Sequence, residues 1–308
     1  MSIAFVFPGQ GSQYVGMGKA LYEKYPLAKE TFDEASEVLG YDMAELCFNG
    51  PKQELDRTFR TQPAILTASI AAYRVFKSFD IEPVAVAGHS LGEYSALVAA
   101  EVMSFKDAVS LTEKRGIFMQ EAVPEGKGLM AAILGLSRDQ VDEICLTVKS
   151  GYVASANFNC PGQIVIAGER EAVEEAISIA KEMGAKRAIP LAVSAPSHCA
   201  LMIEACKRLK EELDKMTLSQ PRVPVVNNAD AIFLNTTDSI KASLIKQLDS
   251  PLLWEDSIRT MIDSGIDTFV EVGPGKVLCG LIRRIDNSVK TLYTDEGIDK
   301  IVETLKSA

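Results

Sequence analysis

The chain is poor in histidine and tryptophan and has no long apolar run. Its 308 residues include two histidines and one tryptophan. No stretch approaches the ~18–20 apolar residues of a membrane-spanning helix. The opening sequence, MSIAFVFPGQ, lacks the basic region and the small-residue cleavage site of a signal peptide. We therefore expect a cytoplasmic protein that does not enter a membrane.

The sequence also lacks a cysteine motif, because its six cysteines form no C-x-x-C pair. In a chain of this size without a secretion signal they are expected to be reduced thiols. Cys199 and Cys206 are seven residues apart in a predicted helix, and we interpret them as small core residues in preference to a metal or redox pair. We expect no metal site and no bound cofactor.

Basic residues are outnumbered, with 32 Lys and Arg against 42 Asp and Glu, a formal charge of −10 and a pI of about 4.9. This balance argues against nucleic acid as a partner. Hydrophobic residues make up 47% and charged residues 24%, as in soluble globular proteins. A chain this long can bury roughly 75% of its unfolded surface, enough for a large domain with a smaller one inserted.

Strand and helix signals alternate in the first part of the chain. This alternation predicts an α/β fold with a parallel sheet covered by helices on both faces. In one of these helices Thr61 is expected to be the cap, with Pro63 in the first turn. The expected elements are a strand at 3–7, a helix at 61–79, a strand at 83–87 and helices at 91–100 and 105–122.

The sequence PEGKG at 124–128 interrupts this rhythm. The segments beyond it read as βαββαβ, a ferredoxin-like unit, with strands at 129–134, 152–157, 163–167 and 186–192 and helices at 138–148 and 171–183. The earlier rhythm then resumes, with helices from Ser197, at 239–247, 254–264 and 276–284, and strands at 223–226 and 268–272. We predict a large domain of residues 1–126 and 195–308 and an inserted subdomain of residues 127–194.

The segment Gly88-His89-Ser90-Leu91-Gly92 carries the strongest chemical signal. It is a G-x-S-x-G motif between a predicted strand and a predicted helix, the context of a nucleophile elbow. Ser90 would stand at a helix start near free backbone N–H groups, including that of Leu91, which can stabilise an oxyanion. The alternative is a glycine-rich turn with an incidental serine.

A nucleophilic serine needs a base, and only two histidines are available. His89 adjoins Ser90, and consecutive side chains diverge in an elbow, so it is a poor base for its neighbour. His198 follows the inserted unit at a break between strand and helix. We therefore predict that His198 is the base.

Two glycine-rich segments resemble nucleotide-binding loops only superficially. FPGQGSQ at 7–13 follows the first strand, so it is expected at the carboxyl edge of the sheet near the elbow. Tyr14 stands where a dinucleotide loop has its third glycine, and GPGK at 273–276 lacks the spacing of a phosphate loop. Both observations argue against a nucleotide cofactor.

Six segments in this order resemble the malonyl-CoA:acyl-carrier-protein transacylase family over essentially the whole chain. They are FPGQGSQ (7–13), TQPA (61–64), GHSLGEYSAL (88–97), LTEKRG (111–116), SAPSHCALM (194–202) and EVGPGKVL (271–278). The resemblance implies a hydrolase-like large domain that contains the inserted ferredoxin-like subdomain.

The resemblance also implies roles for individual residues. Ser90 would be the nucleophile and His198 its base, with the backbone N–H groups of Gln10 and Leu91 as the oxyanion hole. Arg115 would bind the free carboxylate of a malonyl group, for which a planar guanidinium is suited. The other implied substrate-site residues are Gln62 near that arginine, His89, Asn157 or Asn159 toward the pantetheine arm, and Gln247, whose main-chain carbonyl would orient the base.

The implied reaction is ping-pong transfer of malonyl from malonyl-CoA, through a Ser90 ester, to acyl-carrier protein for fatty-acid synthesis. Carrier proteins of this system are acidic, so a basic patch is expected to receive them. The favoured patch is Lys276, Arg283 and Arg284, and the alternative is Lys181, Lys186 and Arg187. No nucleic acid or membrane partner is expected.

Two other functions were weighed. A serine esterase would need an Asp or Glu between Ser90 and His198 in chain order, and most acidic residues there fall in the inserted unit. A carrier-docking module with a dead site would not need Ser90, His198 and Arg115 together. Ser197 departs from the phenylalanine that synthase-embedded malonyl enzymes of the family often carry before the base, and it matches stand-alone enzymes. It leaves malonyl and methylmalonyl both open as substrates.

Overall fold

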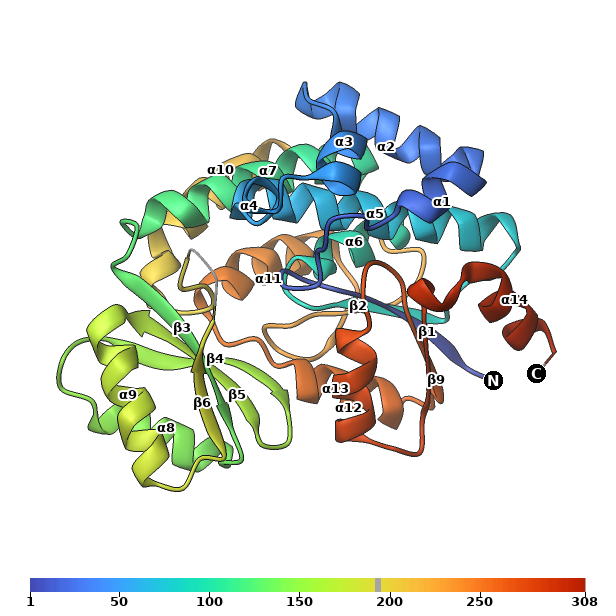
Figure 1. Ribbon diagram of the computed structural model, residues 1–308. Coiled ribbons are helices and arrows are strands. Elements are labelled where there is room, and N and C mark those ends of the chain that lie inside the picture. The colour runs from blue at the N-terminus through green and yellow to red at the C-terminus, as the bar shows by residue number, and fades with distance from the viewer. Residues whose placement is uncertain (192–194, 308) are drawn as a thin grey trace.

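The computed structural model describes residues 1–191 and 195–307 and contains two sheets (Figure 1). The larger sheet has the strand order β10-β9-β1-β2-β7-β8, and all its pairs are parallel except β7 with β8. Its strands are β1 (Ile3–Phe7), β2 (Ala85–Gly88), β7 (Val225–Val226), β8 (Phe233–Leu234), β9 (Thr268–Glu271) and β10 (Lys290–Tyr293).

The central strand β1 is buried on both faces, as expected for a parallel sheet with helices above and below. Side chains alternate along a strand, so Phe5 and Phe7 enter one core while Ala4 and Val6 enter the other. The aromatic ring of Phe5 packs against those of Tyr73 and Phe76 in the first core. The face of β1 that carries Phe5 and Phe7 is covered by more helices than the face that carries Ala4 and Val6.

Figure 1 shows helices α12 and α13 on one side of the larger sheet and α5, α6 and α7 on the other. The thin layer is α12 (Trp254–Asp263) and α13 (Val277–Ile285). The helices that pack on the core containing Phe5 are α1 (Lys19–Lys24), α2 (Pro26–Leu39), α3 (Met43–Asn49), α4 (Lys52–Leu55), α5 (Thr58–Ser78), α6 (Gly92–Ala99), α7 (Phe105–Ala122), α10 (Ile203–Lys215), α11 (Thr237–Asp249) and α14 (Ile298–Lys306). Short 3-10 turns lie at Ala200–Met202 and Thr294–Glu296.

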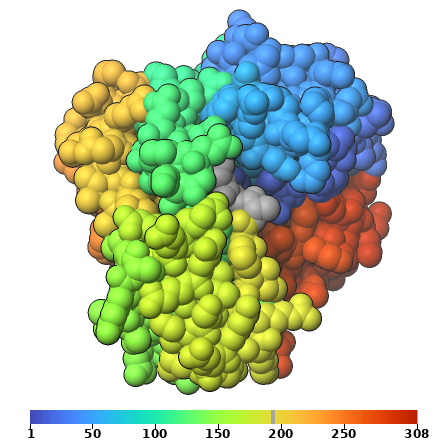
Figure 2. Space-filling model, turned by 60° about the vertical axis from the view of Figure 1, so that its left-hand side comes forward, coloured from blue at the N-terminus to red at the C-terminus, as the bar shows by residue number. Residues whose placement is uncertain are grey.

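The second sheet has four antiparallel strands in the order β4-β5-β3-β6. Counted within the βαββαβ unit this order is 2-3-1-4, the ferredoxin-like arrangement, so the predicted fold class is confirmed. In Figure 2 the unit forms a yellow-green lobe against the rest of the molecule. Its elements are β3 (Gly128–Leu134), α8 (Arg138–Thr147), β4 (Val153–Cys160), β5 (Gln163–Glu169), α9 (Arg170–Glu182) and β6 (Arg187–Pro190).

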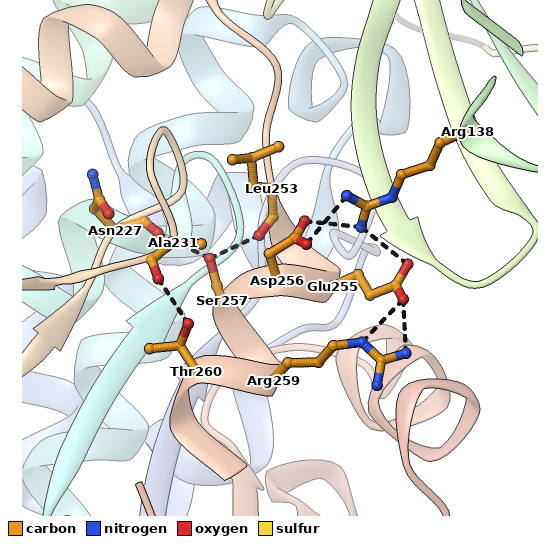
Figure 3. A network of polar contacts seen from close by, with 9 residues as sticks. All are labelled: Arg138, Asn227, Ala231, Leu253, Glu255, Asp256, Ser257, Arg259 and Thr260. Atoms are coloured by element: carbon orange, nitrogen blue, oxygen red, sulfur yellow. Dashed lines mark hydrogen bonds and ion pairs between the residues drawn. The ribbon is translucent and has the colours of Figure 1, made fainter. Parts of the chain in front are cut away.

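The lobe is joined to the large domain along the outer edge of β4. Leu252, just before α12, donates its N–H to Ala156 and accepts from the N–H of Phe158, at 2.8 and 2.9 Å. Beside this joint, Arg138 at the start of α8 bonds to both Glu255 and Asp256 of α12, and Arg259 completes the network (Figure 3). These contacts fix β4, which carries Asn157 and Asn159, relative to the elbow.

The helix predicted at 61–79 begins earlier than expected. Helix α5 starts at Thr58, so Pro63 lies inside it and not in its first turn. Thr61 is not the cap, because its hydroxyl donates to the main-chain carbonyl of Leu55 at 2.5 Å. The hydroxyl of Thr61 therefore bonds to the last residue of α4 and does not cap an N–H of α5.

The helix predicted from Ser197 is also wrong at its start. His198 has φ 62°, a left-handed conformation that no residue of a right-handed helix adopts, and α10 begins only at Ile203. The end of the last subdomain strand at Ala192 and the predicted boundary at residue 194 lie outside the described residues. Within the described residues, no helix is both long enough and apolar enough to cross a bilayer.

Candidate active site

Ser90 stands in a strained turn between β2 and α6. Its φ is 52°, in the left-handed region that is uncommon for residues other than glycine. The turn packs so closely on the end of β1 that a Cβ on Gly92 would lie 2.0 Å from the carbonyl oxygen of Phe7. The second glycine of the motif is therefore required for this close approach, and the turn projects Ser90 from the carboxyl edge of the sheet.

His198 lies within hydrogen-bond distance of the nucleophile. Its Nε2 is 2.8 Å from Ser90 Oγ, and its Nδ1 is 2.7 Å from the main-chain oxygen of Gln247. A carbonyl oxygen only accepts, so Nδ1 carries the hydrogen and Nε2 keeps its lone pair for the hydroxyl of Ser90. The pair has the geometry of a general base and its nucleophile, with a main-chain carbonyl where a triad has an acid.

The imidazole of His198 is held neutral. It is 2% exposed, and burial together with the charge of Arg115 lowers its pKa from 6.5 to about 3, against the opposing hydrogen bond to Gln247. Burial likewise lowers the pKa of His89. Neither ring carries a charge at neutral pH, which is the state that a base requires.

Arg115, from α7, brings a buried cation to the same serine. Its guanidinium donates to the side-chain oxygens of Gln62 at 2.8 Å and Gln247 at 3.0 Å, and to Ser90 Oγ at 3.2 Å. It is 1% exposed, burial lowers its pKa, and among the described residues no carboxylate pairs with it and its Nε has no partner. A buried guanidinium with only neutral partners favours an anionic ligand beside Ser90.

The two predicted oxyanion donors flank the nucleophile. The main-chain N–H groups of Gln10 and Leu91 have no hydrogen-bond acceptor within the described part of the chain, and both residues line the cavity above Ser90. The side chain of Gln10 bonds to Thr58 at 3.2 Å, which fixes its loop. Gly9 beside it could not carry a Cβ, which would lie 2.3 Å from the carbonyl oxygen of His89.

A cavity of about 210 Å³ joins these groups to the subdomain. Asn159 Oδ1 lies 2.8 Å from His89 Nε2, so the elbow and β4 meet in the cavity wall. Gln247 is fully buried behind Arg115 and His198 and does not line the cavity; its main-chain carbonyl meets Nδ1 of His198, the contact that its predicted role of orienting the base requires. The predicted residues that line it are Gln10, Gln62, His89, Ser90, Leu91, Arg115, Asn157, Asn159 and His198.

Two residues of the site were missed. Asn228 Oδ1 accepts the N–H of Ser90 at 2.7 Å, and Glu93 accepts from Gln247 and from the N–H of Asn228. Asn228 follows a buried strand at the carboxyl edge of the sheet, and Glu93 is the acidic residue of the motif GHSLGEYSAL. Both signals were present. In the described residues no cluster of three or more His, Cys, Asp and Glu is placed to hold a metal.

The neutral state of His198 can be measured directly, because the chain has only two imidazoles. We expect the ¹⁵N resonances of His198 to show no protonation near pH 6.5 and the Nδ1–H tautomer, and those of His89 to titrate below the ordinary pKa of 6.5. His89→Asn assigns the two sets of signals. Arg115→Gln removes a positive charge and should raise the pKa of His198. The acid limb of Ser90 acylation should lie below pH 6.5, and a titration of His198 at its ordinary value would contradict this.

Comparison with known proteins agrees with the geometry. The model of the acyl transferase domain family matches residues 4–296. The chain is 51% identical to the malonyl CoA-acyl carrier protein transacylase of Bacillus subtilis (strain 168), covering 99% of this chain and 97% of the relative. It is 54% identical to that of Escherichia coli (strain K12), covering 95% of this chain and 96% of the relative.

Solved structures of such enzymes superpose closely on this fold. The transacylase of Clostridium perfringens has a TM-score of 0.96 at 42% identity, covering 100% of this chain and 98% of that one. A malonyl-transacylase in complex with a type II PKS acyl-carrier protein has a TM-score of 0.94 at 47% identity, covering 95% and 96%. The chain belongs to the acyl transferase family, among the malonyl CoA-acyl carrier protein transacylases.

Proposed function

We propose that this enzyme transfers malonyl from malonyl-CoA to the phosphopantetheine thiol of acyl-carrier protein, through an ester on Ser90, to supply fatty-acid synthesis. The observation that carries the proposal is the guanidinium of Arg115, which lies 3.2 Å from Ser90 Oγ and has no carboxylate partner in the described part of the chain. An acyl group on that oxygen with a carboxylate at its far end can reach the guanidinium. The names of the relatives and the solved carrier-protein complex support the same pair of substrates.

In the first half-reaction Ser90 Oγ attacks the thioester carbonyl of malonyl-CoA while its proton passes to Nε2 of His198. The carbonyl oxygen becomes an oxyanion, which the N–H groups of Gln10 and Leu91 stabilise. Nδ1–H of His198 remains bonded to the carbonyl of Gln247, which holds the ring as it becomes charged. Collapse of the intermediate breaks the C–S bond, and the departing thiolate takes the proton from Nε2.

The second half-reaction reverses these roles. His198 accepts the proton of the carrier-protein thiol, the sulfur attacks the ester carbonyl, and the Ser90 oxygen leaves and recovers the proton. Charge and bonds balance in each step without any further reactant. Arg115 holds the acyl carboxylate throughout, so the ester stays oriented between the two thiols.

An esterase is less well supported. A hydrolase of this type orients its histidine with an Asp or Glu, whereas Nδ1 of His198 meets a main-chain carbonyl. An esterase would also leave Arg115 without a substrate group to bind. The fate of the acyl group separates the two functions, because a hydrolase yields free malonate and a transferase yields acyl-carrier protein.

The proposed docking patch is supported by its place on and beside α13, because Val277, Leu278 and Leu281 of that helix line the cavity. Lys276, Arg283 and Arg284 are exposed, and none of them pairs with a carboxylate among the described residues. Lys276 is the N-cap of α13, one residue before the helix that was predicted to include it. Arg284 bonds to Gln163 and to the carbonyl of Pro161, so it ties the subdomain to α13. Lys276 and Arg283 are therefore the better probes of docking.

Ser90→Ala should bind malonyl-CoA but gain no malonyl mass, because no other residue has the same base and oxyanion donors. His198→Ala should slow acylation by on the order of 10²–10⁴. Intact mass spectrometry after rapid quenching measures both. A malonyl adduct on another residue of Ser90→Ala, or a larger chemical defect in His89→Ala at equal stability, would contradict the assignment.

Arg115→Ala should lose most malonyl transfer, since each charge-assisted hydrogen bond contributes roughly 1.5–3 kcal/mol. Acetyl has no carboxylate and leaves the wild-type guanidinium uncompensated. The malonyl-over-acetyl ratio of kcat/KM should therefore narrow or invert in the variant. An unchanged ratio, measured with both acyl-CoAs, would mean that pocket shape does the choosing.

Reversal of Lys276 and Arg283 to Glu should slow transfer to carrier protein, mostly through the association rate and most at low salt. Loading of Ser90 from malonyl-CoA should stay nearly normal. The matched control is Lys186→Glu with Arg187→Glu, on the alternative patch. If the control variant shows the defect instead, docking takes place on the subdomain.

A further inference from the structure

Glu93 is a fully buried carboxylate that the reaction above does not use. It lies in the first turn of α6, directly behind the elbow. Its Oε2 accepts from Nε2 of Gln247 at 2.9 Å and from the N–H of Asn228 at 3.0 Å, and its Oε1 is 3.5 Å from the hydroxyl of Ser243. Burial of a carboxylate is costly unless its charge serves a partner.

The partner of Glu93 is Arg115, and the side-chain amide of Gln247 links the two. The side chain of Gln247 accepts from Arg115 at its oxygen and donates to Glu93 at its nitrogen, at 3.0 and 2.9 Å. The other partners of Arg115 among the described residues are neutral: Gln62, Ser90 and the ring of Tyr94. A buried cation and a carboxyl group that is an anion above its pKa thus share one polarised amide. Burial raises the pKa of Glu93 to about 7, while Gln247, Asn228 and the charge of Arg115 lower it.

The carboxylate of Glu93 is also linked to Ser90 through two residues, Asn228 and Gln247. Asn228 holds the N–H of Ser90 at 2.7 Å, and Gln247 donates to the carbonyl of Ser90 at 3.0 Å. The main-chain oxygen of Gln247 is the partner of His198. Glu93 is therefore joined, at one remove, to the nucleophile, the base and the acyl-binding cation.

We infer that Glu93 is a positioning residue and the buried counter-ion of Arg115. Its negative charge reduces the electrostatic effect of Arg115 both on the acyl carboxylate and on His198. This inference rests on the proposed function. An anion behind Arg115 weakens the pull on a malonyl carboxylate, and it stabilises the imidazolium that forms in each half-reaction. Malonyl selectivity is thereby held below its maximum in exchange for a stronger base.

The test separates the charge of Glu93 from its shape. In Glu93→Gln the amide oxygen can accept both N–H groups and the new NH₂ can face Ser243, so shape is kept and charge is lost. Above about pH 8, where wild-type Glu93 is ionised, acylation of Ser90 in the variant should be about tenfold slower, while the malonyl-over-acetyl ratio of kcat/KM rises about threefold or more. Glu93→Asp keeps the charge and should keep the wild-type ratio.

Glu271→Gln is the matched control. Glu271 is also fully buried and accepts two main-chain N–H groups, from Leu278 and Cys279, at the start of α13. Its loss of charge should lower the thermal unfolding temperature and leave the acyl ratio unchanged. Rapid-quench mass spectrometry gives the acylation rates, and steady-state assays give kcat and KM for both acyl-CoAs.

Three outcomes would overturn the inference. They are an unchanged rate and ratio in Glu93→Gln, a shift in Glu93→Asp that equals the one in Glu93→Gln, and an unfolded Glu93→Gln beside an active Glu93→Asp, which would make the role structural. The failure of the proposed function looks different, because wild-type enzyme would then form no malonyl ester on Ser90.

Discussion

The structure depends on a positive charge that is buried beside the nucleophile without a carboxylate bonded to it. The guanidinium of Arg115 is almost fully buried and bonded to two glutamines and a serine. Desolvation of a cation is expensive, so the fold must supply dipoles around it until a substrate anion arrives. Much of the polar architecture behind the elbow serves that requirement.

The scaffold meets the requirement by converging separate elements on one sheet edge. Ser90 follows β2, Arg115 comes from α7, His198 from the chain that returns from the inserted subdomain, and Gln247 from α11. Two of the five non-glycine residues that have positive φ in the described part of the chain, Ser90 and His198, lie where these elements meet. The surrounding hydrogen bonds hold these two backbones in conformations that the isolated chain would avoid.

Features that local interactions determine could be predicted from the sequence, and features that depend on tertiary contacts could not. The strand and helix signals of the sequence placed β1 and α7 at their observed bounds, and the βαββαβ order of the subdomain followed from the same kind of signal. Helix starts were misplaced where tertiary contacts decide, as at Thr61, whose hydroxyl bonds outside the helix. The position of Asn228 after a buried strand predicts a place at the sheet edge, but it does not show that the side chain accepts the N–H of Ser90, a residue distant in sequence.

A base with a pKa of about 3 is weak, and the site contains the means to strengthen it. After burial, the charge of Arg115 is the largest influence that lowers the pKa of His198. A malonyl carboxylate bonded to Arg115 offsets that charge, so the imidazole becomes a stronger base when the matching acyl group is in place. An acetyl group brings no such offset. The same guanidinium therefore selects the substrate twice, once through the hydrogen bonds it donates and once through the base that it otherwise suppresses.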